Sequence, residues 1–347
     1  MKKKINTLKI GSNYPPFIIA EISANHNQSL KSAIKMIDQA VKCGVSAVKI
    51  QTYTADEMTL NSSKGSFFIR EKNSLWRGQK LYDLYKRGTT PRKWHKKLFE
   101  HAKKKRIILF STPFSIDAVD FLEQFNPPIY KISSFECNDL ELIARVAQTK
   151  KPIIISTGMA SIKEISDSVA IAKKNGAKKI ILLKCTSTYP APFKDLNLRS
   201  INYLKKKFNC EVGFSDHSLG LTAAISSVAL GATVIEKHFK INSNGLDSAF
   251  SINSVEMKKL VDECNIAKKS LGKIFLGVSV SEKNNIKYKR SLFLIKDVEK
   301  NEKITKNHIK SIRGGYGLPP KLLHYVLKKK SKKKYLAPKP LKLDMFN

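Results

Sequence analysis

Two short apolar segments in the middle of the chain each end in polar residues and a histidine. Val212–Phe214 is followed by Ser215, Asp216 and His217, and Thr233–Ile235 is followed by Glu236, Lys237 and His238. About 15 residues with a helical pattern separate the two β-prone segments, which is enough for a parallel crossover. Because parallel strands end at one edge of a sheet, the two imidazoles could share a divalent metal ion. Two unrelated histidines bonded to backbone are the alternative, and spacing alone does not decide between them.

The rest of the chain repeats this alternation of an apolar strand and an amphipathic helix. Eight such units over about 270 residues predict a (β/α)8 TIM barrel. The expected strands are 17–22, 47–52, 107–113, 129–134, 152–158, 179–187, 212–214 and 233–235. A doubly wound open sheet is the alternative fold, but no GxGxxG motif follows the first strand.

Three segments depart from this alternation. Residues 56–90 are long and polar and carry Trp76, Tyr82 and Tyr85, and a loop of this length inside a compact domain is usually functional. The barrel is predicted to span 1–271, and residues 272–289 read as a linker. The remaining segment, 290–347, has a strand-like start and several turn signals, so it is expected to form a small strand-rich domain.

A barrel would gather the last polar residues of its strands around one mouth. The set is rich in lysine and hydroxyl side chains, which suit a ligand that bears phosphate or carboxylate. Its members are Glu21, Lys49, Gln51, Ser111, Thr112, Lys131, Ser133, Ser134, Ser156, Thr157, Lys184, Thr186, Ser187, Ser215, Asp216, His217, Glu236, Lys237 and His238. Glu21 and Glu136 could supply acid–base function. In a rival mechanism, Lys49 or Lys131 would form a Schiff base with a carbonyl substrate.

The chain is strongly basic. It has 64 Lys and Arg against 28 Asp and Glu, for a net charge of +36. Such a charge can indicate a polyanion partner, but the lysine runs form no tract interleaved with aromatic residues. These runs lie at 2–4, 103–105, 205–207, 328–330 and 332–334, mostly late in helix-like segments, where cations suit the helix dipole. We therefore predict no specific nucleic-acid partner. The positive electrostatic field of the protein is expected to attract anionic substrates.

The cysteines and the hydropathy of the chain indicate the cellular compartment in which it works. The five cysteines, Cys43, Cys137, Cys185, Cys210 and Cys264, are scattered and have no CxxC spacing, which indicates a reducing compartment. The basic start at Met1–Lys4 is not followed by an apolar signal-peptide region, and no apolar run approaches a membrane span. A cytoplasmic protein with no membrane partner is expected.

Eight collinear motifs resemble the sialic acid synthase family over nearly the whole chain. They are AEISANHNQSL (20–30), VKIQTY (48–53), FSTPF (110–114), YKISSFE (130–136), ISTGMAS (155–161), KCTSTYPAP (184–192), GFSDHSLG (213–220) and EKHF (236–239). The resemblance implies a transferase that condenses phosphoenolpyruvate with an amino sugar to a nine-carbon 2-keto acid. Segment 290–347 resembles the family's antifreeze-like (SAF) domain. Residues 76–99, DSAFS at 247–251 and Ser187 are most similar to the pseudaminic acid synthases.

The resemblance also implies roles for individual residues. His217 and His238 would bind a divalent metal ion, Mn²⁺ in the first place, with Mg²⁺ or Co²⁺ as alternatives. Phosphoenolpyruvate would be held by Lys49, Thr112, Lys131, Ser134, Ser156, Ser187 and Ser215. The catalytic set would be Glu21, His217, His238 and Arg313, and the sugar would meet Glu136, Tyr189, Asp247 and Arg313. Arg313 would come from the C-terminal domain of a partner subunit in a domain-swapped homodimer, although the family's Arg-Pro-Gly is Arg313–Gly314–Gly315 here.

The resemblance to the pseudaminic acid synthases implies that the sugar is 2,4-diacetamido-2,4,6-trideoxy-L-altrose, a diacetamido-trideoxy hexose. A sugar of manno configuration, as used by N-acetylneuraminate and legionaminate synthases, is the alternative within the family. A basic protein that binds nucleic acid or carbohydrate without catalysis is the alternative outside it.

Overall fold

The computed structural model describes residues 8–72 and 74–347, so the lysine run at 2–4 lies outside the described residues. The chain forms two compact units, Met1–Gly272 and Lys273–Asn347. Within the described residues, no helix is long and apolar enough to cross a membrane.

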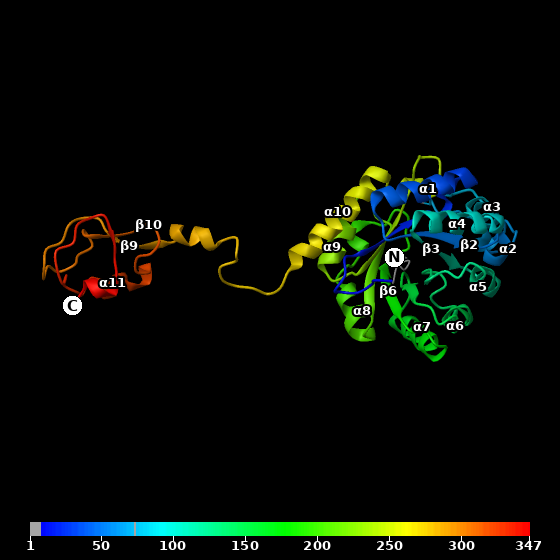
Figure 1. Ribbon diagram of the computed structural model, residues 1–347. Helices are drawn as coiled ribbons and strands as arrows, with labels where there is room; N and C mark the ends of the chain where they lie inside the picture. The colour runs from blue at the N-terminus through cyan, green and yellow to red at the C-terminus, as the bar shows by residue number, and fades with distance from the viewer. Residues whose placement is uncertain (1–7, 73) are drawn as a thin grey trace, which may run out of the picture. The chain divides into compact units, whose positions relative to one another are not determined.

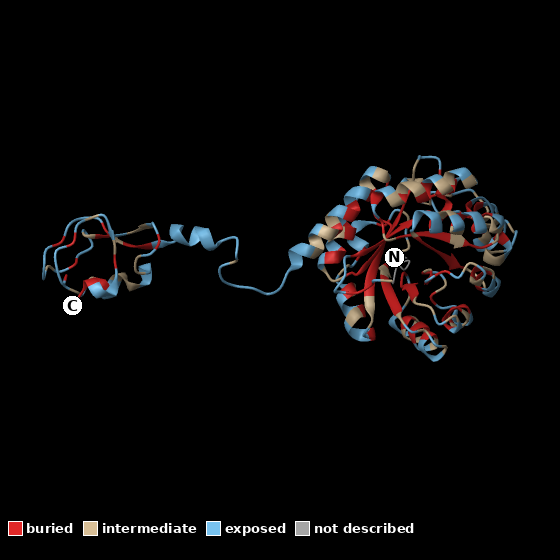
Figure 2. Ribbon diagram, in the orientation of Figure 1, coloured by how far each residue is buried: buried red, intermediate tan, exposed pale blue. Residues whose placement is uncertain are grey.

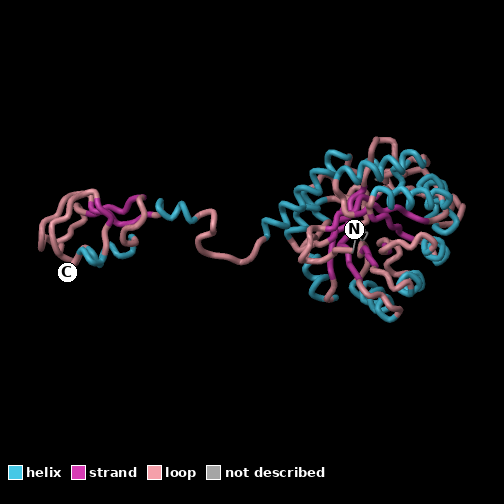
Figure 3. Tube along the Cα trace, viewed as in Figure 1, coloured by secondary structure: helices cyan, strands magenta, loops and turns pink. Residues whose placement is uncertain are grey.

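Eight parallel strands close into a barrel in the first unit, with each strand paired to the next in sequence and β8 paired to β1 (Figures 1 and 3). They are β1 (Phe17–Glu21), β2 (Ala47–Thr52), β3 (Ile108–Pro113), β4 (Tyr130–Ile132), β5 (Ile153–Ser156), β6 (Ile180–Cys185), β7 (Glu211–Asp216) and β8 (Val234–His238). The (β/α)8 prediction is confirmed. The last two strands run further than predicted and include the polar residues up to Asp216 and His238, because closure pairs these residues with neighbouring strands.

Helices surround this barrel in Figure 1. They are α1 (Leu30–Cys43), α4 (His95–Lys105), α5 (Ile116–Glu123), α6 (Leu140–Gln148), α7 (Ile162–Lys174), α8 (Ser200–Phe208), α9 (Thr222–Ala229) and α10 (Ser254–Leu271). Helix α1 shows how the sequence sets the boundaries. The Ser29 hydroxyl accepts a hydrogen bond from the Ser32 N–H at the start, and Gly44 ends the helix with φ of 78°, as a C-terminal glycine does. The lysine runs at 103–105 and 205–207 occupy the last turns of α4 and α8.

The strands carry two different cores on their two faces. Side chains that alternate along each strand, such as Phe17 and Ile19 of β1, pack together inside the barrel. The intervening residues, such as Ile18 and Ala20, pack against the helices. Figure 2 shows the strands as the buried centre of this unit. The inward series of β1 continues to Glu21, so the barrel interior is apolar at one end and becomes polar at the carboxyl ends of the strands.

Segment 56–90, predicted as a long loop, contains two short helices, α2 (Ala55–Met58) and α3 (Leu81–Gly88), and a 3-10 turn at Gly65–Phe67. Pro91 follows this segment and precedes a 3-10 turn at Arg92–Trp94, and α4 begins at His95.

The second unit is small and strand-rich. It contains β9 (Arg290–Leu294), β10 (Ile309–Arg313), β11 (Lys339–Pro340) and α11 (Leu323–Val326), and its sheet has the order β10-β9-β11. Leu292, Leu294 and Val326 belong to its separate apolar core. The predicted linker contains a 3-10 turn at Lys283–Tyr288.

Candidate active site

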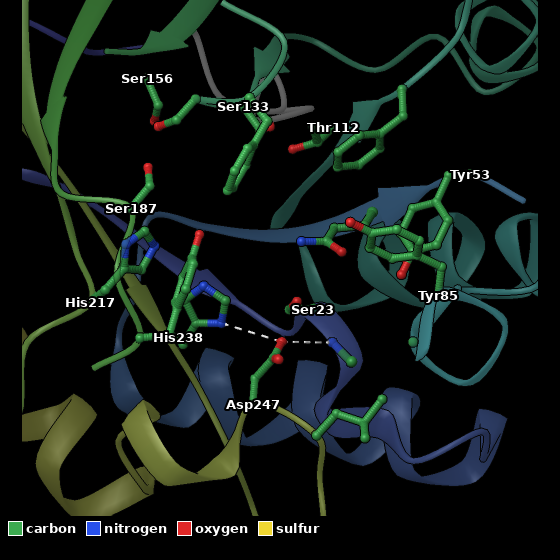
Figure 4. Close-up of a pocket in the computed structure, with 18 of the residues that line it drawn as sticks. Ser23, Tyr53, Tyr85, Thr112, Ser133, Ser156, Ser187, His217, His238 and Asp247 are labelled. Carbon is green, nitrogen blue, oxygen red and sulfur yellow. Dashed lines mark hydrogen bonds and ion pairs between the residues drawn. The ribbon is translucent and has the colours of Figure 1, made fainter. Parts of the chain in front are cut away.

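A cavity of about 630 Å³ opens at the carboxyl ends of the barrel strands. Twelve of the fourteen residues predicted for the site line it: Lys49, Thr112, Lys131, Ser134, Glu136, Ser156, Ser187, Tyr189, Ser215, His217, His238 and Asp247. Figure 4 shows His217 and His238 projecting toward the same space as Ser187, with Tyr53 and Tyr85 across the cavity from them. Glu21 lies beside this lining, in contact with Lys49.

Two lysines and two carboxylates form a buried charge network at the floor of the cavity. The Lys49 ammonium makes an ion pair with Glu21 and donates to Thr112 Oγ1 at 3.1 Å. Glu236 lies between the two lysines, with its carboxylate oxygens 3.8 Å from Lys49 Nζ and 3.7 Å from Lys131 Nζ. All four side chains are at most 5% exposed. The four charges compensate one another in this buried position, and both lysines also line the cavity, where their ammonium groups could bind an anionic ligand.

Burial sets the proton affinities in this network. Burial raises the pKa of Glu21 to about 7, although the Lys49 ammonium lowers it. Burial lowers the pKa of Lys131, partly offset by the Glu236 carboxylate. The pKa of Lys49 is raised, because Glu21 and Glu236 outweigh the opposing effect of burial. A persistently charged Lys49 argues against its use as a Schiff-base nucleophile, which requires a neutral amine.

Hydroxyl groups converge on the same region around Gly158. A Cβ atom at this glycine would lie 2.2 Å from Ser187 Oγ and 2.7 Å from Ser134 Oγ, so only glycine leaves room for both. The Gly158 N–H donates to Ser134 Oγ at 3.2 Å, and the Ser156 hydroxyl is buried and has no hydrogen-bond partner among the described residues. The unpaired Ser156 hydroxyl and the neighbouring serine hydroxyls, in a cavity that also contains two ammonium groups, suit phosphate or carboxylate oxygens.

The two histidines fit the chemistry of a divalent metal ion. Their ring centroids lie 5.3 Å apart. His217 Nδ1 lies 3.0 Å from the Thr186 carbonyl oxygen, and donation there leaves Nε2 as the free electron pair. Burial, reinforced by the His217 charge, lowers the pKa of His238 well below its ordinary value, whereas the pKa of His217 is raised, because the lowering effect of burial is outweighed by the neighbouring Cys185. A bound metal ion requires both imidazoles to be neutral. Among the described residues no set of three or more His, Cys, Asp or Glu side chains forms a metal cluster, so waters or substrate would complete the shell.

The opposite side of the cavity is largely apolar. Segment 56–90 contributes Met58, Ile69, Trp76 and Leu84 to the lining. The Trp76 indole N–H lies 3.4 Å from the Leu246 carbonyl oxygen, and its ring lies 6.0 Å from that of Tyr189. The segment therefore forms a wall of the cavity, in agreement with the expectation that so long an insertion is functional.

Carboxylates flank this wall. Asp247 Oδ2 accepts from the Ala24 N–H at 3.3 Å and lies 3.6 Å from His238 Nδ1, as the dashed lines in Figure 4 show. Burial raises the pKa of Glu136, whose carboxylate accepts a hydrogen bond from Ser133.

Several strand-end residues expected at the mouth do not line the cavity. Ser111, Thr157, Lys184, Thr186, Asp216 and Lys237 are absent from the lining. The prediction was wrong for these residues because neighbouring residues of a strand point to opposite faces. Conversely, Glu236 had no assigned role, although it bridges both lysines. Alternation from Val234 through Glu236 to His238 was the signal that could have identified it.

Arg313 lies in the second unit, at the end of β10, and its side chain is exposed. Its predicted role toward the sugar stays a prediction.

Comparisons with known proteins agree with this geometry. A model of the NeuB family matches residues 36–275. The pseudaminic acid synthase of Campylobacter jejuni is 46% identical over 319 residues, which cover 91% of this chain and 92% of that protein. The pseudaminic acid synthase of Helicobacter pylori is 41% identical over 334 residues, covering 95% of this chain and 97% of that protein.

The fold is also found among solved structures. The crystal structure of N-acetylneuraminic acid synthetase from Leptospira borgpetersenii, in complex with citrate, aligns with a TM-score of 0.73 and 33% identity. The alignment covers 83% of this chain and 96% of that one.

Proposed function

Because the chain belongs to the NeuB family, we propose that it is an enzyme that condenses phosphoenolpyruvate with an amino sugar. The specific reaction we propose is that of a pseudaminic acid synthase, in which 2,4-diacetamido-2,4,6-trideoxy-L-altrose and water are the other substrates. Relatives with that name share 46% and 41% identity with this chain over more than nine-tenths of its length. Pseudaminic acid and phosphate are the products.

One observation carries the proposal: a single cavity joins an anion site, a histidine pair and an apolar wall. Lys49 and Lys131, with the hydroxyls of Thr112, Ser134, Ser156, Ser187 and Ser215, supply what the phosphate and carboxylate of phosphoenolpyruvate require. The apolar residues of segment 56–90 suit the acetamido methyls and the deoxy carbon of the sugar. Glu136, Tyr189 and Asp247 supply polar contacts to it.

The residues of this cavity can carry the reaction as follows. Phosphoenolpyruvate carbon 3 forms a bond to the aldehyde carbon of the open-chain sugar, and the aldehyde oxygen takes a proton. Water then adds to the cationic carbon 2, and Glu21, with its pKa of about 7, is suited to accept the proton that water releases. Collapse of that adduct breaks the bond between carbon 2 and the phosphate oxygen, which gives the keto acid. The two lysines neutralise the departing phosphate.

His217 and His238 would hold the divalent metal ion, for which we propose Mn²⁺. When bound, the metal supplies Lewis-acid polarisation of the sugar aldehyde. Two observations support this proposal: the ring centroids lie 5.3 Å apart, and the bond of His217 Nδ1 to the Thr186 carbonyl leaves its Nε2 available.

The second unit, by resemblance, is an antifreeze-like domain that acts across a homodimer. We propose that Arg313 contacts the sugar bound in the cavity of a partner subunit. Its side chain is exposed on β10, which is compatible with such a contact. Gly314, at φ of 159°, takes a backbone conformation closed to proline, so the loop after Arg313 differs locally from the family's Arg-Pro-Gly.

Phosphate release from phosphoenolpyruvate in the presence of Mn²⁺ and the altrose sugar tests the reaction. We expect release only when both substrates are present, with loss on addition of EDTA and in His217→Ala. Release that is unaffected by metal removal would contradict the proposed role of the histidines, and the absence of release from folded protein would contradict the reaction itself.

A further inference from the structure

A fully buried ion pair joins β7 and β8 immediately behind the two histidines. Lys237 Nζ lies 2.8 Å from Asp216 Oδ2, and both side chains are 0% exposed. Asp216 and Lys237 are direct partners across the two strands. The pair therefore closes the β7–β8 ladder at the carboxyl edge of the barrel.

Each member of the pair directly precedes one of the histidines. Ser215 and His217 line the cavity, as do Glu236 and His238, whereas Asp216 and Lys237 do not. The alternation of a strand accounts for this difference, because it sends residues 216 and 237 to the outer face. An ion pair on the outer face thus fixes the two backbone segments from which the histidine rings project into the cavity.

The pair also holds the chain on the far side of His217. Asp216 Oδ1 accepts from the Ser218 N–H at 2.9 Å and from the Ser218 hydroxyl at 2.6 Å. Lys237 Nζ donates in addition to the Ser218 carbonyl oxygen. His217 therefore lies between Asp216, which is a member of the ion pair, and Ser218, which is hydrogen-bonded to both members.

The histidine ring nitrogens make few hydrogen bonds of their own, although the rings pack against Tyr189 and Phe250. Among the described residues, His238 Nδ1 has no hydrogen-bond partner and lies 3.6 Å from Asp247 Oδ2, and His217 Nδ1 lies 3.0 Å from the Thr186 carbonyl oxygen and 3.8 Å from Cys185 Sγ. A buried ion pair is in general no more stabilising than an apolar pair of similar volume. Stabilisation of the fold therefore does not explain why two charged residues lie here. A role in fixing the positions of the two histidines does.

We propose that the Asp216–Lys237 ion pair is a positioning device that holds His217 and His238 at the separation needed to share one metal ion. The inference rests on the proposed metal site. Both residues act through the histidines and touch no substrate, so they are positioning residues rather than catalytic ones.

Mn²⁺ binding to the metal-free protein, followed by electron paramagnetic resonance without substrates, tests this proposal. In the double variant Asp216→Asn with Lys237→Met, both charges are removed and the side-chain volumes are nearly kept. We expect it to fold and to bind Mn²⁺ about 10- to 100-fold more weakly than the wild type, as substitutions behind metal ligands generally do. A folded double variant with wild-type Mn²⁺ affinity would overturn the proposal and leave the pair a purely structural one.

A matched control lies at the other end of the same two strands. The hydroxyl of Thr233, which directly precedes β8, lies 3.1 Å from Glu211 Oε2 and 3.0 Å from the Val212 carbonyl oxygen, both on β7. Thr233→Val removes this hydroxyl and should leave Mn²⁺ affinity unchanged. Equal losses in the control and the double variant would mean that general loosening of the strands, and not the ion pair, weakens the site.

Two further measurements can each overturn the proposal. If the double variant does not fold, Ser218→Ala, which removes one hydrogen bond to Asp216, should still weaken Mn²⁺ binding several-fold, and unchanged affinity there would overturn the proposal. A wild-type protein that binds no Mn²⁺, or binds it as tightly as His217→Ala, would overturn it together with the metal site. Because no substrate is present, these outcomes are separate from success or failure of the condensation reaction.

Discussion

The surroundings of Glu21 give it the pKa that its proposed role as a proton acceptor requires. It is 1% exposed at the end of β1, and burial raises its pKa to about 7 against the lowering effect of Lys49. A carboxyl group with this pKa is partly ionised at neutral pH, which is the range in which acid–base catalysis is most effective.

Glu21→Gln should therefore lower kcat/KM for phosphoenolpyruvate by about 100-fold or more and change its pH dependence. As a proton acceptor Glu21 must be ionised, so the wild-type kcat/KM should rise with pH and level off above about 7. The variant should lack this rise. The measurement is kcat/KM for phosphoenolpyruvate between pH 5.5 and 8.5 at saturating sugar.

Glu136→Gln is the control for this experiment. Burial also raises the pKa of Glu136, but its carboxylate accepts a hydrogen bond from Ser133 and lies in the part of the cavity that we assign to the sugar. It should raise the sugar KM and keep the rise of kcat/KM for phosphoenolpyruvate with pH. A Glu21→Gln enzyme with the wild-type pH profile would show that another group accepts the proton.

At this scale the sequence predicted most of the lining, and its errors have one cause. Strand-end position identified Lys49, Lys131 and the serines, but position alone does not say which face a side chain takes. Asp216 and Lys237 were counted at the mouth although alternation sends them outward, and Glu236 received no role although alternation sends it inward.

Among the elements, segment 56–90 is the one that gives the cavity its apolar side. Its two short helices, α2 and α3, bring Met58 and Leu84 to the lining, and Trp76 comes from the stretch between them. The sequence indicated an insertion with a function but not these helices, because short helices depend on tertiary packing more than on their own propensity. The barrel strands were predicted more fully, since long periodic segments determine them.

Trp76→Ala should weaken sugar binding and leave phosphoenolpyruvate binding intact. The Trp76 ring lies 6.0 Å from the ring of Tyr189 and 6.5 Å from that of Phe250, and among the described residues it makes no hydrogen bond to the lysine network. The sugar KM should therefore rise about tenfold while that of phosphoenolpyruvate changes little. Steady-state kinetics with each substrate varied in turn provides the measurement. Leu75→Ala, at an adjacent side chain that is 45% exposed, is the matched control and should be silent. Equal increases in both KM values would contradict a wall that serves the sugar alone.

At the scale of the whole molecule, two features extend beyond one barrel. The charge of +36 should attract phosphoenolpyruvate from solution, an effect that salt screens. The proposed use of Arg313 across a dimer requires a second copy of the chain. Sequence could suggest this arrangement only through family resemblance, because an exposed arginine at the end of a strand carries no periodic or compositional signal of its own.

Mixing two impaired variants tests the exchange between subunits. His217→Ala and Arg313→Ala should each have low activity, and co-expressed dimers should recover about a quarter of the wild-type rate if Arg313 acts in the partner's cavity. In a mixed dimer, one cavity then has both its own His217 and an intact Arg313 from the other subunit. No recovery from confirmed mixed dimers would place Arg313 beside its own barrel or outside the reaction.

The central claim is that this cavity joins phosphoenolpyruvate to a diacetamido-trideoxy sugar of altro configuration. The most direct test offers the Mn²⁺-loaded enzyme phosphoenolpyruvate with 2,4-diacetamido-2,4,6-trideoxy-L-altrose, its manno-configured counterpart or N-acetylmannosamine, and identifies the keto acid by mass spectrometry. We predict turnover with the altrose sugar alone, with one phosphate released per keto acid formed. Turnover with a manno sugar instead would contradict the sugar assignment, and a folded, metal-loaded enzyme that forms no keto acid with any of them would contradict the account as a whole.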